Sequence, residues 1–461
     1  MKHVAIVGGG IAGMAAAFAL QQKALSSSQP VQVTLLESNQ RLGGKIVTYQ
    51  QDGFVLEGGP DSFITQKPWG LTLCREIGIE DELIPCNEAE QAVYLVKGSQ
   101  LERMPTGFRL VAPTRWGPFL SSRLLSIGGK LRVAADLFLP ARREQSDESI
   151  ASFLRRRFGA EAMEALGGPM MAGIYVADPE KLSLRATFPM FAELEKKHRS
   201  VIRGLVRARK AAEGRPKGPP MFMSFRDGMQ TLVDRLESRL DCEIRRGVAV
   251  RALHRAAQGW SLDLEPGEPL TVDGVILALP PGGAAELLAP HDAELAAGLR
   301  AIRCVSSAVL SLGFRAEDVP ASRPLDGFGF VAPKRAGRTM LACTWSSTKF
   351  PGRAPEGFVL LRAFVGGATN EAVAELPEDE IEKLVREEIA ALMGIRAEPV
   401  VRQFTRWPRG NPQYDVGHLD RVADLEAQVA DLPGIALAGG AYRGIGIPDC
   451  IHGARQAAES I

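Results

Sequence analysis

A glycine-rich turn near the start of the chain constrains the fold more than any other feature. Gly8, Gly10 and Gly13 form a G-x-G-x-x-G motif, which follows the apolar residues 4–7 and precedes the helix-forming residues 14–20. Between a buried strand and a helix, such glycines allow a tight bend and a close approach of the backbone to a pyrophosphate. The unpaired N–H groups at the start of the helix then face the phosphates. The motif therefore predicts a Rossmann-like dinucleotide-binding unit.

An acidic residue completes this unit. Glu37 ends the second apolar run, residues 31–36, in the region about 20 residues beyond the motif where a carboxylate accepts hydrogen bonds from ribose hydroxyls. A solvated strand end is the alternative interpretation of Glu37. The combination of strand, turn, helix, strand and acid favours dinucleotide binding.

The same residues could be taken for a secretory signal, because the short charged start is followed by an apolar segment that ends at Leu20. Four glycines interrupt that segment and no small-residue cleavage site follows it, so we expect it to belong to the folded protein. No other window approaches the roughly 18 apolar residues that a membrane span requires. We expect a protein that is soluble or at most peripheral to a membrane.

The composition is that of an ordinary globular protein. The chain has 461 residues, of which 45% are hydrophobic and 24% charged, and a formal net charge of +1. A near-neutral balance argues against nucleic acid as a partner. The six cysteines include no C-x-x-C pair and the six histidines form no cluster, so we expect neither a metal site nor a disulfide framework. A reducing cytoplasm fits this cysteine usage best.

A second glycine pair narrows the choice of dinucleotide. Arg41 precedes Gly43 and Gly44, shortly after the expected ribose acid. A guanidinium can bind a diphosphate while bare backbone approaches the cofactor. Nicotinamide-binding Rossmann units do not require such a pair, whereas many two-domain flavoproteins have it, so FAD is favoured; a turn with a surface arginine is the alternative.

The C-terminal residues repeat the arrangement of strand, glycines and helix start. Residues 435–438 form an apolar run that leads into Gly439 and Gly440, and residues 444–449 open a helix. This is again an anion-binding geometry, here suited to the flavin ring and ribityl end. An ordinary turn between a strand and a helix is the alternative.

The segments between these ends predict a discontinuous, mixed α/β and α+β architecture. We expect a Rossmann-like FAD-binding domain from residues 1–85, 221–285 and 430–461, and a substrate domain with a mixed sheet from residues 86–104, 206–220 and 286–429. In the latter, strands at 307–313, 339–345 and 357–365 and a helix at 378–393 are predicted.

Residues 105–205 predict a helical insertion. Its arginines alternate with large apolar residues, which suits either a membrane surface or a helical subdomain whose arginines extend to solvent. The basic run at 196–217 predicts a solvated helix face followed by a linker, and attraction of an anionic ligand is the alternative.

Together these residues resemble the flavin-dependent protoporphyrinogen and coproporphyrinogen oxidases of haem synthesis, within the amine oxidase-like flavoprotein group. The more specific motifs are residues 57–63, 172–179 and 197–200, together with Trp407, 412–414 and 417–418. The tail 444–451 is most similar to the soluble Gram-positive bacterial type, whose substrate is coproporphyrinogen III. Val176 and Ala177 stand where the resemblance leads us to expect Ala-Gly. We expect this difference to alter the packing around the substrate macrocycle.

The resemblance implies FAD as cofactor and a role for each matching residue. Val248 would meet the adenine end through its backbone, and Trp407 would flank the isoalloxazine. The implied cofactor contacts are Gly8, Gly9, Gly10, Ile11, Ala12, Gly13, Glu37, Ser38, Arg41, Gly44, Lys45, Gly58, Gly59, Pro60, Asp61, Val248, Trp407, Ile445, Gly446 and Ile447. The implied substrate contacts are Lys67, as a propionate anchor, and Gly173, Ile174 and Tyr175.

The implied reaction converts a porphyrinogen to a porphyrin with dioxygen as oxidant and hydrogen peroxide as by-product. Orientation over the flavin can suffice without a dedicated acid or base, and we predict no catalytic side chain and no metal. Arg103, Arg109 and Arg199 are further candidates for binding the substrate carboxylates.

Several alternatives stay open at this point. Protoporphyrinogen IX is the alternative substrate, and an amine oxidase, a carotenoid desaturase, a non-catalytic porphyrin carrier and a nicotinamide dehydrogenase are the alternative functions. Peripheral contact with the inner membrane face and transient contact with a ferrochelatase are further expectations.

Overall fold

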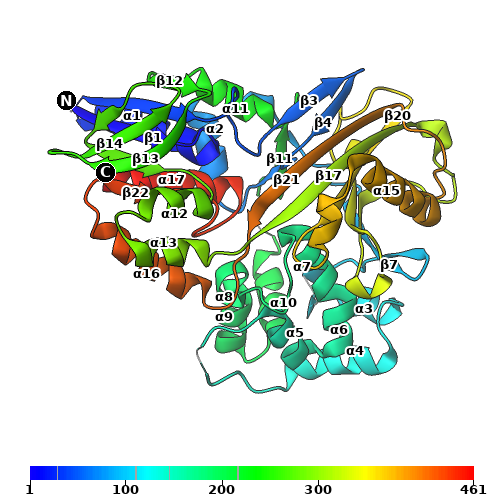
Figure 1. Ribbon diagram of the computed structural model, residues 1–461. Helices are drawn as coiled ribbons and strands as arrows, with labels where there is room; N and C mark the ends of the chain where they lie inside the picture. The colour runs from blue at the N-terminus through cyan, green and yellow to red at the C-terminus, as the bar shows by residue number, and fades with distance from the viewer. Residues whose placement is uncertain (28–29, 110–111, 145, 215–217) are drawn as a thin grey trace.

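The computed structural model describes residues 1–27, 30–109, 112–144, 146–214 and 218–461. Figure 1 shows three regions: a parallel sheet with helices beside the two chain ends, a long twisted sheet, and a group of short helices below both. We call them the cofactor region, the mixed-sheet region and the helical region.

The cofactor region is built on a five-stranded parallel sheet in the order β12-β2-β1-β16-β22. Its strands come from distant parts of the chain, as the discontinuous Rossmann-like fold requires. They are β1 (Lys2–Val7), β2 (Val31–Glu37), β12 (Glu243–Arg246), β16 (Gly274–Leu277) and β22 (Ile435–Leu437). Residues 4–7 of β1 and all of β16 are apolar and buried, because both faces of a parallel sheet are covered.

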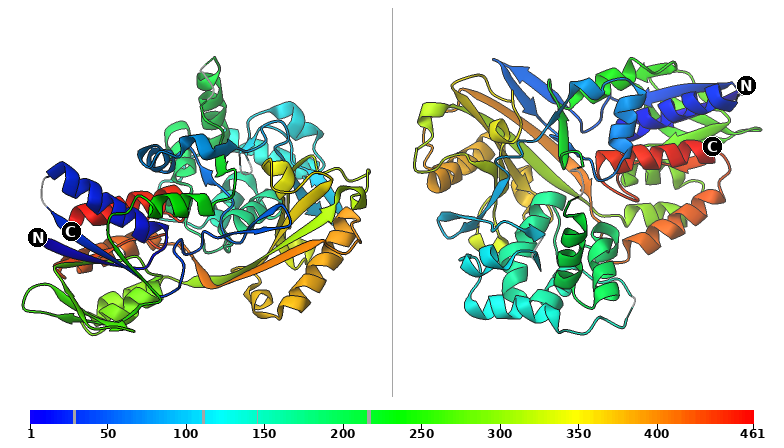
Figure 2. Two further views of the ribbon diagram at one scale, coloured as in Figure 1. Left: turned by 90° about the horizontal axis from the view of Figure 1, so that it is seen from above. Right: turned by 180° about the vertical axis from the view of Figure 1, so that it is seen from behind.

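The first and last helices lie side by side over this sheet, as both views in Figure 2 show. These are α1 (Ile11–Ser27) and α17 (Ile447–Ser460). Both bury mainly small side chains, Ala15 and Ala16 in α1 and Ala454 and Ala458 in α17. Small residues let the two helix axes approach closely, so the two ends of the chain share one core.

Smaller elements surround the parallel sheet. The excursion between β12 and β16 forms an antiparallel hairpin, extended by a third strand. The surrounding elements are β3 (Thr48–Gln51), β4 (Phe54–Glu57), β5 (Phe63–Ile64), α2 (Trp69–Glu76), β6 (Leu83–Pro85), β11 (Phe222–Phe225), α11 (Gln230–Glu237), β13 (Ala249–Arg255), β14 (Trp260–Glu265), β15 (Leu270–Val272), α12 (Pro281–Leu288), α13 (Ala293–Arg300) and α16 (His418–Ala430).

The mixed-sheet region has seven strands in the order β21-β17-β20-β19-β18-β7-β8. All pairs are antiparallel except β18 with β7. The elements are β7 (Ala92–Lys97), β8 (Gln100–Arg103), β17 (Cys304–Arg315), β18 (Gly327–Val331), β19 (Met340–Trp345), α14 (Ser346–Lys349), β20 (Phe358–Gly366), α15 (Glu378–Met393) and β21 (Val401–Pro412). The predicted mixed sheet and the helix at 378–393 are confirmed.

The helical region contains the predicted helical insertion. Its elements are β9 (Phe108–Arg109), β10 (Ala112–Pro113), α3 (Trp116–Ser121), α4 (Ile127–Ala134), α5 (Ile150–Phe158), α6 (Ala160–Ala162), α7 (Gly168–Tyr175), α8 (Leu184–Thr187), α9 (Pro189–His198) and α10 (Val201–Ala212). Residues 205 and 206, between which a domain boundary was predicted, both lie in α10, an amphipathic helix that contains part of the basic run. The other domain boundaries stay predictions.

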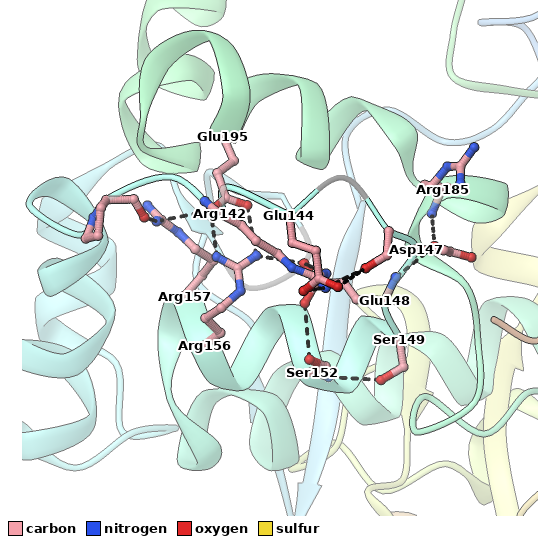
Figure 3. Close-up of polar contacts among 12 residues, drawn as sticks. Arg142, Glu144, Asp147, Glu148, Ser149, Ser152, Arg156, Arg157, Arg185 and Glu195 are labelled. Carbon is pink, nitrogen blue, oxygen red and sulfur yellow. Dashed lines mark hydrogen bonds and ion pairs between the residues drawn. The ribbon is translucent and has the colours of Figure 1, made fainter. Parts of the chain in front are cut away.

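A polar network holds the helical region together (Figure 3). Arg157 is buried and donates to the buried carboxylate of Asp136 at 2.6 Å, and Ser200 donates to the same carboxylate. Arg156 donates to Glu148 at 2.7 Å and to Glu195 at 2.6 Å. Charge-assisted hydrogen bonds thereby join α5 to α9, to the segment before α5 and to the residues that follow α4 and precede α10.

Candidate cofactor and substrate site

The turn between β1 and α1 has no room for a side chain at Gly8 or Gly13. A Cβ added to Gly13 would lie 1.8 Å from the carbonyl oxygen of Gly8, and one added to Gly8 would lie 2.5 Å from the carbonyl oxygen of Ala278. Gly8 also has a positive φ of 109°, which L-residues rarely adopt. The predicted motif is therefore a sterically required turn that exposes the start of α1.

The second glycine pair lies against this turn. The Gly43 N–H donates to the carbonyl of Gly9 at 2.8 Å, and a Cβ on Gly44 would lie 3.1 Å from the Cα of Gly10. Arg41 donates to three carbonyls of its own turn, those of Leu42, Gly44 and Ile46. Its guanidinium thus shapes the glycine turn, and its contact with a diphosphate stays a prediction.

Glu37 is buried at the end of β2, where it faces the glycine turn. Its Oε2 accepts from the Gly9 N–H at 2.7 Å and its Oε1 accepts from the Asn39 N–H at 2.8 Å. The Val248 N–H donates to the Glu37 carbonyl at 3.0 Å, and Ser38 adjoins the carboxylate. The predicted ribose acid and the predicted adenine-side residue therefore lie together.

In the segment from Gly58 to Asp61, main chain again packs directly against main chain. A Cβ on Gly59 would lie 1.7 Å from the carbonyl of Lys45. Two side chains of the mixed sheet hold its carbonyls, since Trp407 donates to Gly58 at 2.9 Å and Arg362 donates to Gly59. Pro60 follows in the same segment, which thus joins the cofactor region to the mixed sheet.

Sequence reasoning missed the cations that surround Asp61. Lys349 lies 2.8 Å from the Asp61 carboxylate and Arg362 lies 3.7 Å from it, and all three side chains are largely buried. Burial alone would raise the pKa of Asp61, but the two cations outweigh burial and hold that pKa well below its usual value. Burial lowers the pKa of Arg362 and raises that of Glu57, which lies nearby.

Lys45 lies between Gly59 and Gly410. Its side chain reaches solvent, yet protein surrounds it closely enough that burial lowers the pKa of its ammonium. Lys45 donates to the carbonyl of Gly410, just beyond Trp407. Cys304 and Cys450 are close enough to influence its charge, so residues from both ends of the chain surround this position.

The C-terminal glycine segment is held in place by aromatic residues. The Tyr414 hydroxyl donates to the Gly440 carbonyl at 2.8 Å, and the His418 ring stacks on Tyr414 with 3.9 Å between centroids. Gly446 precedes the first turn of α17, where Ile447 is buried, while Ile445 is 37% exposed. The predicted flavin-side residues thus present an apolar side chain beside a helix start.

The predicted substrate residues meet the same helix start. Lys67 forms an ion pair with Asp449 in the first turn of α17, with 2.6 Å between Nζ and Oδ1. Burial raises the pKa of Tyr175 to about 12, and the charge of Asp449 adds to this shift. Lys67 is thus partnered rather than an isolated cation, while Gly173 is exposed at the end of α7.

The departure at Val176 has a conformational consequence. Val176 has a φ of 54°, which is unusual for a β-branched residue. Its carbonyl accepts from the Ala368 N–H at 3.0 Å, so the strained turn ties the end of α7 to the mixed sheet. Ile174 lies in α7, but its side chain is outside the described residues.

The three candidate arginines differ in position. Arg103 ends β8 at the edge of the mixed sheet, and Arg199 closes α9 with a left-handed backbone whose carbonyl accepts from Arg157. The Lys-His-Arg-Ser motif therefore forms a turn between helices. The side chain of Arg109 lies outside the described residues.

The residues present fit FAD. Glycine segments without room for a Cβ follow one another from Gly9 to Gly59, and the Thr405 hydroxyl beside Gly58 is buried without a hydrogen-bond partner among the described residues.

In the described part of the chain, no group of three or more His, Cys, Asp or Glu residues could hold a metal ion. None of the described helices is long and apolar enough to cross a bilayer.

Comparisons with known proteins agree with this geometry. The sequence model of the family of flavin-containing amine oxidoreductases matches residues 11–461. A coproporphyrinogen III oxidase of Bacillus subtilis (strain 168) is 38% identical over 98% of this chain and 96% of its own. A coproporphyrinogen III oxidase of Propionibacterium freudenreichii subsp. freudenreichii is 34% identical over 100% of this chain and 90% of its own. A crystal structure of a candidate protoporphyrinogen oxidase from Exiguobacterium sp. 255-15 has a TM-score of 0.88 and 33% identity, covering 100% of this chain and 98% of that one.

Proposed function

Because the chain belongs to the flavin-containing amine oxidoreductase family, we propose that it is an FAD-dependent oxidase that converts coproporphyrinogen III to coproporphyrin III. The observation that carries this proposal is the full-length similarity to two coproporphyrinogen III oxidases, together with glycine segments whose close main-chain packing fits FAD. Protoporphyrinogen IX is the alternative substrate, supported by the name of a solved relative.

The chemistry itself comes from the cofactor. Bound FAD would supply two-electron oxidation of substrate C–H bonds with dioxygen as the final acceptor, so that the six-electron oxidation of one porphyrinogen would take three rounds and yield three hydrogen peroxide molecules. The side chains of this protein are left with binding and orientation.

The residues divide these tasks between the regions. The N–H groups that open α1, together with Glu37 and Val248, would hold the ADP half of FAD. Trp407 and the residues 445–447 would enclose the flavin ring and exclude water. Lys67 would bind a substrate carboxylate, beside the end of α7. Every side chain in this set binds or positions, and none is assigned a proton.

The decisive test is anaerobic reduction of the purified holoenzyme by each porphyrinogen in turn. We expect bleaching of the flavin absorbance by coproporphyrinogen III at least about tenfold faster than by protoporphyrinogen IX. With dioxygen, porphyrin fluorescence and hydrogen peroxide should appear in a ratio of one to three. Bleaching by an amine or a polyene, but by neither porphyrinogen, would contradict the proposal.

We further propose that the helical region contacts a membrane surface from the cytoplasmic side. Four large apolar side chains in and near α3 and α4 are highly exposed: Leu120 (60%), Ile127 (79%), Leu131 (68%) and Phe138 (83%). Arg115 and Arg123 are exposed in the same stretch. An apolar strip bordered by cations suits an anionic lipid interface.

Sedimentation with vesicles tests this contact. Anionic phosphatidylglycerol vesicles should bind the wild-type protein, and the double substitution Leu131→Ser and Phe138→Ser should abolish the binding. The exposed Leu25→Ser variant in α1 is the matched control. Equal binding of all three proteins would contradict the proposal.

Transfer of the product to a ferrochelatase is the remaining proposed contact. Cross-linking of the two proteins in the presence of coproporphyrin tests this contact.

A further inference from the structure

The ion pair between Lys67 and Asp449 joins two parts of the substrate side that are 382 residues apart in the sequence. The two partners differ in exposure, because the side chain of Lys67 is 41% exposed whereas that of Asp449 is 11% exposed. The ammonium can therefore be reached from solvent, while the carboxylate lies behind it. A ligand approaching this pair meets Lys67 first.

The main chain around Asp449 leaves room for its carboxylate. A Cβ on Gly444 would lie 2.3 Å from the Asp449 Cγ, and one on Gly446 would lie 3.1 Å from its Oδ2. Asp449 also lies in the first turn of α17, where the helix dipole favours a negative charge. The carboxylate is thus fixed in place, whereas Lys67 is on an irregular segment before α2.

The pair lies where the substrate residues meet the cofactor residues. Asp449 lies two residues after the predicted flavin-side residues 445–447, and its charge acts on the half-buried Tyr175 in α7. With its partner charged, Lys67 presents almost no net charge to an incoming carboxylate. Without that partner, the same ammonium would bind a carboxylate more tightly.

We propose that Asp449 limits how tightly Lys67 binds a substrate carboxylate. This inference rests on the proposed function. The substrate carboxylate shares the ammonium with Asp449 instead of replacing it, so the carboxylate-bearing product leaves readily. Asp449 acts through Lys67 and is a positioning residue, not a catalytic one.

The test is Asp449→Asn in the holoenzyme. The KM for coproporphyrinogen III and the Kd for coproporphyrin III should both fall about three- to tenfold, and both should become more sensitive to salt. The kcat should fall, because product release slows. Asp449→Glu keeps the charge and should restore values near those of the wild type. Asp420→Asn, which removes an exposed acid at 3.7 Å from Arg185, is the matched control and should change neither constant.

Several outcomes would overturn the inference. An unchanged KM and Kd in Asp449→Asn would show that Asp449 does not weaken binding at Lys67. Equal changes in the Asn and Glu variants would indicate a purely structural role. A double substitution Asp449→Asn with Lys67→Met must lose the tighter binding, and retention of it would place the carboxylate elsewhere. If the wild-type enzyme oxidised neither porphyrinogen, the proposed function would fail, but coproporphyrin binding would still test Asp449 separately.

Discussion

The cofactor residues and the substrate residues of this site are built from opposite constraints. Near the predicted cofactor contacts, main chain packs directly against main chain, and no side chain fits at Gly13 or Gly59. On the substrate side, the charge of Lys67 is paired with that of Asp449. The first kind of constraint tolerates no added atom, whereas the second is graded, because an ion pair can be weakened or shared.

The largest expected effect comes from adding one methyl group on the cofactor side. Gly13→Ala places a Cβ against the carbonyl of Gly8, so the turn must move and FAD affinity should fall at least about a hundredfold. The ratio of flavin to protein absorbance after purification measures this loss. Gly453→Ala in α17 is the matched control, because nothing lies within 4 Å of that position. It should keep full flavin content, and a similar loss there would contradict the steric explanation.

The next largest effect tests whether paired charges also determine stability. Arg157→Met leaves the buried Asp136 without its cation and should lower the free energy of unfolding by about 3–5 kcal/mol, measured by urea denaturation. Arg155→Met breaks an exposed pair with Glu180 and should cost about 1 kcal/mol or less. Equal costs would mean that burial does not separate the two pairs.

A smaller effect is expected in acid. The pKa of Asp61 is lowered in the folded protein, so its stabilising contribution is complete above the usual value of 3.8 and is lost as the pH falls towards the folded pKa. Lys349→Met removes one of the two cations and should move the acid unfolding midpoint to higher pH by about 0.5 units, measured by circular dichroism. Lys349→Arg keeps the charge and should unfold near the wild-type midpoint. An unchanged midpoint in Lys349→Met would show that Arg362 alone suffices.

The smallest effect concerns the strained turn after α7. Val176→Gly should raise the free energy of unfolding by about 0.5–1 kcal/mol, because glycine adopts a positive φ without a side-chain clash. Val176→Ala keeps a Cβ and should not stabilise. Thermal unfolding distinguishes the two variants, and a larger gain for alanine would show that packing, not the backbone, causes the strain.

The contrast between local and long-range constraints also explains which parts of the fold could be predicted from the sequence. The strand, turn and helix around Gly13 and the helix at 378–393 depend on local patterns, and the structure confirms both. Strand β21 was missed because Pro408 and Gly410 interrupt it, and an edge strand tolerates such residues. Strand β18 was missed because it is short and contains Gly329.

Charge pairs between distant residues could not be predicted in this way. Asp61 and Lys349 are 288 residues apart, and nothing near Lys349 in the sequence distinguishes it from a surface lysine. Arg362 offered a weak signal, a charged residue inside the apolar run of β20. The sequence suggested Lys67 as a cation for the substrate but contained no indication that Asp449 neutralises it.

The joining of the two chain ends in one sheet has a consequence for biosynthesis. Strands β1 and β2 are synthesised early, whereas β22 and α17, which complete the sheet and cover α1, follow every other described element. Until these two elements emerge from the ribosome, the apolar faces of the early elements lack their partners and are exposed to aggregation.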